Sequence, residues 1–427
     1  MNEITNKIVT AEQAVTYMQG AKIAVFSHAA GMPIEIIKEM CNQSSKFNNL
    51  KVFHMLGLGD GEYMQKAYKD NFRHITNFVG ANSRNAVIEN RADFSPCYFH
   101  EVPTLFSNDI MSVDVAVIHI SYPNEDGFCS YGISCDYTKP AAENAKIVIA
   151  EMNKQMPYVK GDNFIHISDI DYIVETDNPI YTIDSPKLKE TEICIGKYCA
   201  DLIEDESTLQ LGIGSIPDAV MDCLCEKKNL GIHSEMISDG VEKLFKMGVI
   251  TGSAKTIHKE KMVATFIMGT SNFYDFINNN ENIELHPVNY VNDPYVIAQN
   301  NKMVSINSCI EIDLMGQVNS ETIGLTQYSG VGGQIDFIRG ASMSKGGKSI
   351  LAIPSTAAKG KLSRIVPFLT HGAAITTSRN DIDYVVTEFG IAKLKYKTLK
   401  QRAKELINVS HPQFRDELNY EYKKRFE

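Results

Sequence analysis

The sequence predicts an α/β fold: two open, mainly parallel α/β domains with the active site in the cleft between them. Short runs of β-branched and other apolar residues alternate with stretches of helical period. Several runs open into turns rich in Gly, Pro or Ser before a helix begins, which is typical of parallel strands covered on both faces. With 427 residues, the chain is too long for one ordinary core.

The first half supplies one set of strands. The apolar run 21–26 ends in the small-residue turn 27–33, and a helical pattern follows it. Pro, Asn and Asp interrupt the pattern at 175–179 and 184–187, so we place the domain boundary there, with domains 1–185 and 186–427. The strands expected in the first half are 21–26, 51–56, 113–120 and 146–152.

The second half shows the same alternation of strands and helices, but its sequence does not repeat that of the first half. A helix is expected around 193–203, and another begins at Asp218 after the segment 208–217. From Leu399 onward the chain looks helical and charged. The strands expected in the second half are 229–232, 262–268, 303–306, 349–353, 373–377 and 384–387.

Composition excludes several classes of function. A net charge of −10 argues against a nucleic-acid surface, although a local site can still bind an anion. The nine cysteines show no zinc spacing, so we expect no metal and reduced thiols in a cytosol. No run is long and apolar enough for a membrane helix, and no apolar signal core opens the chain, so we expect neither membrane insertion nor export.

Glu235, within the run LGIHSEM at 230–236, is the most informative residue. It follows a short apolar stretch and precedes the small polar segment 237–240, so it is placed at a strand end to meet a ligand. A solvated loop glutamate is the competing interpretation, since glutamates are mostly exposed. His233, two residues earlier, would share its face in an extended segment and either orients a ligand or makes a structural hydrogen bond.

Two glycine-rich turns accompany this carboxylate. The run QLGIG at 210–214 lies on a strand-to-helix turn, where backbone N–H groups can approach an anionic ligand or where glycines simply allow tight packing. It lacks the third Gly of a dinucleotide site and the Lys of a P-loop. The run SGVGGQID at 329–336 indicates a second loop of backbone donors, or a flexible surface turn.

Other segments are less specific. Asn292 lies in the turn-like run NDP, and the Lys-rich segments 346–348 and 359–364 either meet phosphates or form a solvated face. No GxSxG elbow is present, which disfavours a serine hydrolase.

Long segments in one order resemble the family I coenzyme A transferases, in the acetyl-CoA hydrolase/transferase branch. They include SYPNEDGFCSYGIS from Ser121, TLQLGIGSIPDAV from Thr208, LGIHSEMISDGV from Leu230, SGVGGQIDFIRGA from Ser329 and SRNDIDYVVTEFGIA from Ser378. The similarity spans nearly the whole chain and is greatest to members that act on 4-hydroxybutyrate or butyrate.

The resemblance implies roles for individual residues. Glu235 would be the catalytic glutamate that becomes a glutamyl-CoA thioester. Ile213 and Gly333 would donate backbone N–H groups to an oxyanion hole, and Asn292 would lie near the reacting carbonyl. The segment 27–30 (SHAA), which departs from some members, would shape the acyl pocket. The residues implied to bind CoA are Gln210, Leu211, Gly212, Ile213, Gly214, Ile310, Gly333 and Lys359.

The resemblance also implies the activity. A short-chain acyl-CoA, with 4-hydroxybutyryl-CoA first, would exchange its CoA with acetate or another short carboxylate in anaerobic fermentation. Butyryl-CoA:acetate transfer, acyl-CoA hydrolysis by the same glutamate and a non-catalytic ligand sensor are the alternatives. We expect coenzyme A as substrate only, no permanently bound cofactor, a cytoplasmic location, no nucleic-acid or membrane partner, and a homodimer or dimer of dimers.

Overall fold

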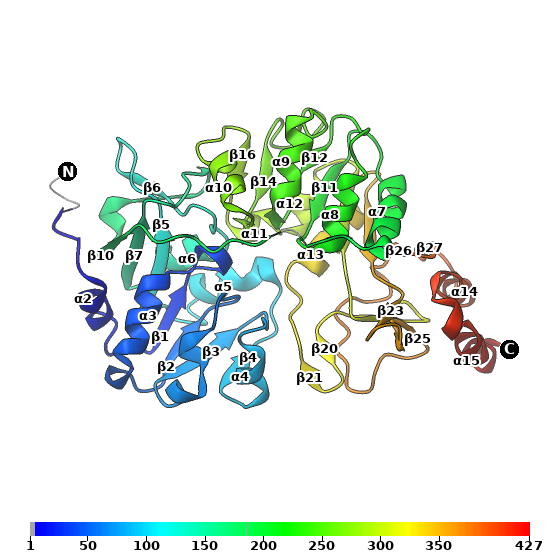
Figure 1. Cartoon of the computed structure of the whole chain (residues 1–427), viewed down its shortest axis with the longest axis horizontal. Coiled ribbons are helices and arrows are strands. Elements are labelled where there is room, and N and C mark those ends of the chain that lie inside the picture. The colour runs from blue at the N-terminus through cyan, green and yellow to red at the C-terminus, as the bar shows by residue number, and fades with distance from the viewer. Residues whose placement is uncertain (1–4, 185) are drawn as a thin grey trace. The chain divides into compact units, whose positions relative to one another are not determined.

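The computed structural model describes residues 5–184 and 186–427, which form two compact units (Figure 1). The N-terminal unit contains Met1–Ile183 and Val263–Val291, and the C-terminal unit contains Asp184–Met262 and Asn292–Glu427. The expected domains, 1–185 and 186–427, do not include this return of the chain. Strand β16 (Ile283–Leu285) pairs with β8 (Lys160–Gly161), and Thr265 accepts two backbone hydrogen bonds from residues 135 and 136, which ties the returning segment to the N-terminal unit.

A seven-stranded sheet, in which every pairing is parallel, forms the centre of the N-terminal unit. Its central strands are mostly buried, and the run VAVIHI, which forms β5, is buried throughout. In spatial order the strands are β10 (Tyr172–Thr176), β7 (Ile147–Asn153), β5 (Val115–Ile120), β1 (Ile23–Phe26), β2 (Leu50–Phe53), β3 (Phe72–Thr76) and β4 (Ala92–Phe94).

Short helices accompany this sheet. Helix α3 turns Ile36, Ile37 and Met40 into the core, and full burial of such a side chain stabilises the fold by about 1.5–3 kcal/mol. Helix α2 begins with a capping box between Thr10 and Gln13. The helices of this unit are α2 (Ala11–Thr16), α3 (Ile34–Asn42), α4 (Arg84–Ile88), α5 (Val102–Ser107), α6 (Thr138–Glu143), α10 (Ser271–Ile277) and α11 (Val288–Val291).

The C-terminal unit is built on a six-stranded sheet, parallel except for its last pair, β26 and β27. In spatial order the strands are β12 (Gly231–Ile232), β11 (Thr208–Leu211), β17 (Met303–Asn307), β22 (Lys348–Ala352), β26 (Tyr384–Thr387) and β27 (Gly390–Lys393). The helices are α7 (Glu190–Leu202), α8 (Ser215–Asp222), α9 (Asp239–Lys246), α12 (Pro294–Ala298), α13 (Gln334–Met343), α14 (Leu399–Val409) and α15 (Arg415–Phe426).

Each sheet has a point where the order of its strands reverses direction. In the N-terminal unit β1 lies between β5 and β2, and in the C-terminal unit β11 lies between β17 and β12. In open α/β sheets, ligands bind beyond the carboxyl ends of the strands at such a switch point. The turns after β1 and β11 are therefore the first places to look for a site.

The predicted α/β class with mainly parallel sheets is confirmed, and most expected strands are present. The strand expected at 373–377 is wrong: only Thr377 forms an isolated bridge, to Val318. The N–H groups of Ala374 and Thr376 donate to the Thr322 hydroxyl and the Val318 carbonyl, in the short strands β20 (Thr322–Ile323) and β19 (Val318–Asn319), and the run forms no strand of its own. The run 262–268 divides into β14 (Met262–Ala264) and β15 (Phe266–Ile267).

Two further observations bear on the class of protein. No helix in the described residues has the length and apolar character needed to cross a bilayer. All nine cysteines are free thiols, and burial raises the pKa of Cys129 and Cys309 to about 12. These two thiols are therefore poor nucleophiles at neutral pH.

Candidate active site

The switch point of the C-terminal unit lies between β11 and β17. Gln210 near the end of β11 and Asn307 at the end of β17 face each other, and the amide of Asn307 donates to Gln210 Oε1 at 3.1 Å. Gln210 is 5% exposed, so its side chain joins the two strand ends and does not extend into solvent. The expected contact of Gln210 with CoA would have to come from its backbone or from rearrangement of this pair.

The glycine turn after β11 is open. Gly214 has φ +111°, a conformation that favours glycine, and it precedes the first turn of α8. A Cβ added at Gly212 or at Gly214 would meet no atom within 4 Å, and Ile213 between them is 39% exposed. This turn has room beside its backbone for a ligand, and its contact with CoA remains a prediction.

Glu235 lies directly beyond β12, between that strand and β13 (Met236–Ile237), and its side chain is half-buried. The neighbouring Ser234 ties this segment to the glycine turn, because its hydroxyl donates to the Leu211 carbonyl at 3.0 Å and accepts the Leu211 N–H at 3.3 Å. His233 is buried, and its ring lies 6.3 Å from that of Phe337. The role of His233, in orienting a ligand or in making a structural hydrogen bond, remains a prediction.

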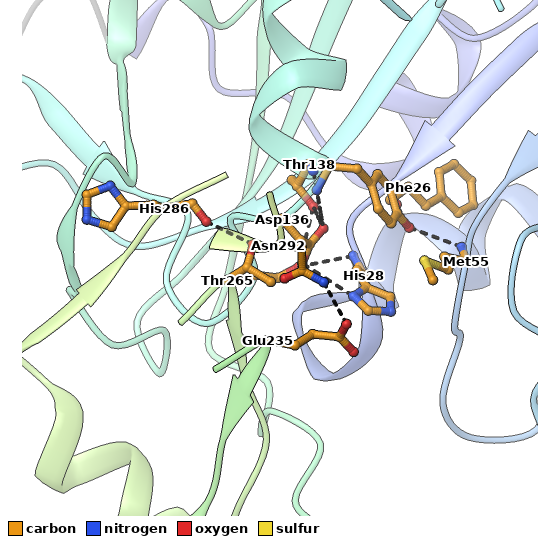
Figure 2. A network of polar contacts seen from close by, with 11 residues as sticks. Phe26, His28, Met55, Asp136, Thr138, Glu235, Thr265, His286 and Asn292 are labelled. Atoms are coloured by element: carbon orange, nitrogen blue, oxygen red, sulfur yellow. Dashed lines mark hydrogen bonds and ion pairs between the residues drawn. The ribbon is translucent and has the colours of Figure 1, made fainter. Parts of the chain in front are cut away.

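Asn292 holds the Glu235 carboxylate. Its side-chain amide donates a hydrogen bond from Nδ2 to Glu235 Oε2 at 2.9 Å, and Figure 2 shows the two groups facing each other. Asn292 is fully buried, and the next residue, Asp293, caps the start of α12 through the N–H of Tyr295. A turn residue by composition is thus placed against the candidate nucleophile.

Gly333 also lies against the Glu235 carboxylate. A Cβ added there would lie 1.9 Å from Glu235 Oε2 and 2.3 Å from Asn292 Nδ2, so only glycine fits. Gly333 is also the residue before the first turn of α13, whose helix dipole favours negative charge at that end. The preceding Gly332 adopts a left-handed conformation, with φ +53°. The glycine-rich loop therefore brings a helix N-terminus up to the carboxylate.

Two other expected CoA contacts lie elsewhere in the C-terminal unit. Ile310 follows β17 at the switch point, is half-buried and donates its N–H to the Asn319 carbonyl at 2.8 Å. Lys359 is exposed in the turn between β23 (Thr356–Ala357) and β24 (Leu362–Ser363). Both remain predictions as CoA contacts.

The switch point of the N-terminal unit carries different chemistry. His28 follows β1, and its Nδ1 lies 3.3 Å from the buried Asp136 carboxylate (Figure 2). The imidazole packs among the rings of Phe99, Tyr137 and Phe266. The segment 27–30 thus holds a buried imidazole between a carboxylate and three aromatic rings, and its role in shaping the acyl pocket remains a prediction.

The residues around Glu235 are arranged so that its carboxylate can act as a nucleophile. A half-buried carboxylate with a fixed amide donor and a helix N-terminus beside it can attack an electrophilic carbonyl, while fixed donors stabilise the oxyanion that forms. Sequence reasoning missed Ser234 and Asp336. The Asp336 carboxylate also accepts from Asn292 Nδ2, at 3.4 Å. Both lie inside the segments already singled out, and only the folded contacts reveal their partners.

Known proteins share this fold and sequence. The N-terminal domain of acetyl-CoA hydrolase/transferase matches residues 1–183, and its C-terminal domain matches residues 269–422. The chain is 57% identical to the 4-hydroxybutyrate coenzyme A transferase of Clostridium kluyveri over 98% of both chains. It is 42% identical to the succinyl-CoA:cyclohexane-1-carboxylate CoA transferase of Geobacter metallireducens, over 97% of this chain and 95% of that one.

A solved structure agrees with these sequence matches. The crystal structure of 4-hydroxybutyrate CoA-transferase from Porphyromonas gingivalis superposes with a TM-score of 0.87 at 45% identity. The match covers 99% of this chain and 98% of that one.

Proposed function

Because the chain belongs to the acetyl-CoA hydrolase/transferase family, whose relatives here are CoA-transferases, we propose that it moves CoA between 4-hydroxybutyryl-CoA and acetate or another short carboxylate. Glu235 is the covalent nucleophile of this reaction. One observation carries the proposal: Asn292 Nδ2 donates to Glu235 Oε2 at 2.9 Å, and Gly333 lies directly beside the same carboxylate oxygen.

The first half of the reaction loads CoA onto the enzyme. A Glu235 carboxylate oxygen attacks the thioester carbonyl, the carbon–sulfur bond breaks, and CoA leaves as a thiolate from an acyl-glutamyl anhydride. The thiolate sulfur then attacks the glutamyl Cδ. The anhydride carbon–oxygen bond breaks, which leaves glutamyl-CoA and a free carboxylate, with charge and atoms conserved.

The second half reverses these steps with another acid. The incoming carboxylate attacks the glutamyl-CoA carbonyl and expels the CoA thiolate, which then attacks the new acyl carbonyl. The products are a new acyl-CoA and the Glu235 carboxylate. A carboxylate nucleophile suits this exchange, because an anhydride is reactive enough to regenerate a thioester.

The surrounding groups have matching tasks. Asn292 fixes the carboxylate and, with the backbone N–H groups of Ile213 and Gly333, stabilises each oxyanion. The open turn 210–214, together with Ile310 and Lys359, binds CoA, whose pyrophosphate suits glycine turns and a basic side chain. CoA is a substrate in this scheme and no metal takes part.

Acyl recognition falls to the segment 27–30. His28, fixed by Asp136, offers a polar partner among aromatic rings, which suits a short chain with one hydroxyl. The relative from Clostridium kluyveri bears the name of the 4-hydroxybutyrate enzyme, which favours that acid over butyrate.

A donor and acceptor panel tests the proposal. Acetyl-CoA, butyryl-CoA and 4-hydroxybutyryl-CoA are each incubated with and without a carboxylate acceptor, and the acyl-CoA products are separated. A transferase forms new acyl-CoA only when the acceptor is present. Equal loss of acyl-CoA without any acceptor would identify the hydrolase instead, and no turnover with any pair would contradict both.

The expected assembly follows from the resemblance, whereas the expected location and partners follow mainly from the composition and charge of the chain. We expect a homodimer or a dimer of dimers in the cytoplasm, with small-molecule substrates and no nucleic-acid or membrane partner. Light scattering of the purified protein checks the oligomeric state, and a monomer would contradict this expectation.

A further inference from the structure

The amide of Asn292 lies between two carboxylates, and only one of them is the proposed nucleophile. Nδ2 donates to Glu235 Oε2 at 2.9 Å and to Asp336 Oδ2 at 3.4 Å. An amide NH₂ has two N–H groups, one for each acceptor. The geometry points to Asp336 as a positioning residue that keeps the Asn292 amide directed at the nucleophile; this inference rests on the proposed function of Glu235.

Asp336 is placed for this task by α13. It is the third residue of that helix, three positions after Gly333, and it is 1% exposed. Helix α12, which follows Asn292, packs closely on α13, where a Cβ at Gly340 would lie 2.4 Å from Ile297. The close packing of the two helices fixes the distance between Asn292 and Asp336.

The orientation of the Asn292 amide is set by the hydrogen bonds of its nitrogen. Its Oδ1 is buried and has no hydrogen-bond partner within residues 5–184 and 186–427. Rotation of the amide by half a turn would direct Oδ1 at the two carboxylates, which repel it if both are ionised. The two carboxylates together therefore select the orientation in which N–H faces Glu235.

The contribution of Asp336 is largest after Glu235 has reacted. As a carboxylate, Glu235 accepts a charge-assisted hydrogen bond from Asn292, and such bonds are about twice as strong as neutral ones. As an anhydride or a thioester, Glu235 carries no charge and holds the amide less firmly. Asp336 is not consumed in the reaction, so it keeps the donor in place for the oxyanions of the later steps.

The test uses the single variants Asp336→Ala, Asp336→Asn and Asn292→Ala. It also uses the double variant that combines Asn292→Ala with Asp336→Ala. Asp336→Ala should lower kcat by about 10- to 100-fold with the KM for acyl-CoA within about twofold, because small misplacement of a donor slows the chemical step. Asp336→Asn, which still offers an acceptor oxygen, should recover most of that loss. In the Asn292→Ala background, Asp336→Ala should cause no further loss.

A buried carboxylate in the same unit provides the matched control. Asp383 is 5% exposed, so Asp383→Asn tests the effect of altering a buried acid without touching Glu235 or Asn292. It should alter the melting temperature and leave kcat near that of the parent protein. An equal fall in kcat for Asp383→Asn and Asp336→Ala would assign Asp336 a merely structural role.

Other outcomes separate this inference from the proposed function. No CoA exchange by the unaltered protein would refute the proposed function, and crystal structures then test Asp336 without any turnover. In crystal structures of Glu235→Gln, where position 235 carries no charge, the Asn292 amide should keep its position, and it should lose that position when Asp336→Ala is added. An unmoved amide in the Glu235→Gln, Asp336→Ala protein, or a full additional loss of kcat when Asp336→Ala is added to Asn292→Ala, would overturn the inference.

Discussion

Glu151 and Glu235, one in each unit, each lie beside the N-terminus of a helix, and their surroundings differ. Glu151 on β7 is completely buried, and its Oε2 accepts the N–H groups of Glu35 and Ile36 at the start of α3. Glu235 lies beside the start of α13, is half-buried and is held by the side-chain amide of Asn292. The backbone binds the first carboxylate, whereas the side chain of Asn292 binds the second.

The difference shows how one arrangement serves two purposes. Burial raises the pKa of Glu151 to about 7, and its bonds to α3 join that helix to strand β7 of the N-terminal unit. Gly333, whose missing Cβ makes room for Glu235 Oε2, leaves that carboxylate accessible at the open edge of its sheet. A helix N-terminus attracts a carboxylate in both cases, and the space around it decides whether the carboxylate can react.

The largest effect should come from removing the charge of Glu235. Glu235→Gln should lower CoA exchange by about four orders of magnitude or more, as loss of a covalent nucleophile does elsewhere, with an unchanged melting temperature. Steady-state assays and thermal melts measure both. The matched variant Glu151→Gln should retain exchange, and comparable losses in the two variants would break the comparison.

The next effect concerns the space beside Glu235. Gly333→Ala should lower kcat by about 100- to 1,000-fold, because a Cβ there would displace Glu235 and Asn292 by an ångström or more. The control is Gly212→Ala, where no atom lies within 4 Å of the added Cβ. It should leave kcat largely intact and raise the KM for acyl-CoA if the turn binds CoA, whereas similar kcat values for both variants would contradict the crowding argument.

A smaller effect is expected at the switch point of the N-terminal unit. His28→Ala should change acyl selectivity about tenfold, measured as the ratio of kcat/KM for 4-hydroxybutyryl-CoA to that for butyryl-CoA, since the imidazole would meet the hydroxyl. The variant should still form glutamyl-CoA from butyryl-CoA. An unchanged ratio would remove the segment 27–30 from acyl recognition.

The smallest effect is on stability and follows the pKa of Glu151. Because its pKa rises from 4.5 to about 7 on folding, its favourable contribution is complete below pH 4.5 and is lost as pH rises through 7. Glu151→Gln cannot titrate, so its melting temperature should fall less between pH 5 and pH 8 than that of the parent protein, by a few degrees. Parallel melting curves across that range would contradict the assignment.

Much of the fold could be read from the sequence, because buried parallel strands have a continuous apolar pattern. The runs at β1, β5 and β7 are of this kind, and the turns after them carry Gly, Pro or Ser. The run 373–377 looks similar, but it contacts Val318 only through one isolated bridge and separate hydrogen bonds, which no local pattern reveals. The return of Val263–Val291 to the N-terminal unit likewise depends on distant pairing.

The candidate site divides in the same way. Glu235 and the two glycine turns stand out by composition, and the family resemblance assigned Asn292. Asp336 and Ser234 carry no such signal, because their importance comes from contacts with residues 44 and 23 positions away in the chain. The sequence therefore points to the candidate nucleophile and to Asn292, whereas the contacts of Asp336 and Ser234 require the structure.

Trapping the intermediate on Glu235 tests the central claim most directly. The protein is incubated with acyl-CoA without an acceptor, treated with borohydride, digested and analysed by mass spectrometry. We expect the side chain at position 235 to be reduced to the alcohol that a glutamyl thioester gives, and Glu235→Gln to show no such change. An unmodified Glu235 in protein that exchanges CoA, or the modification at another residue, would contradict the account.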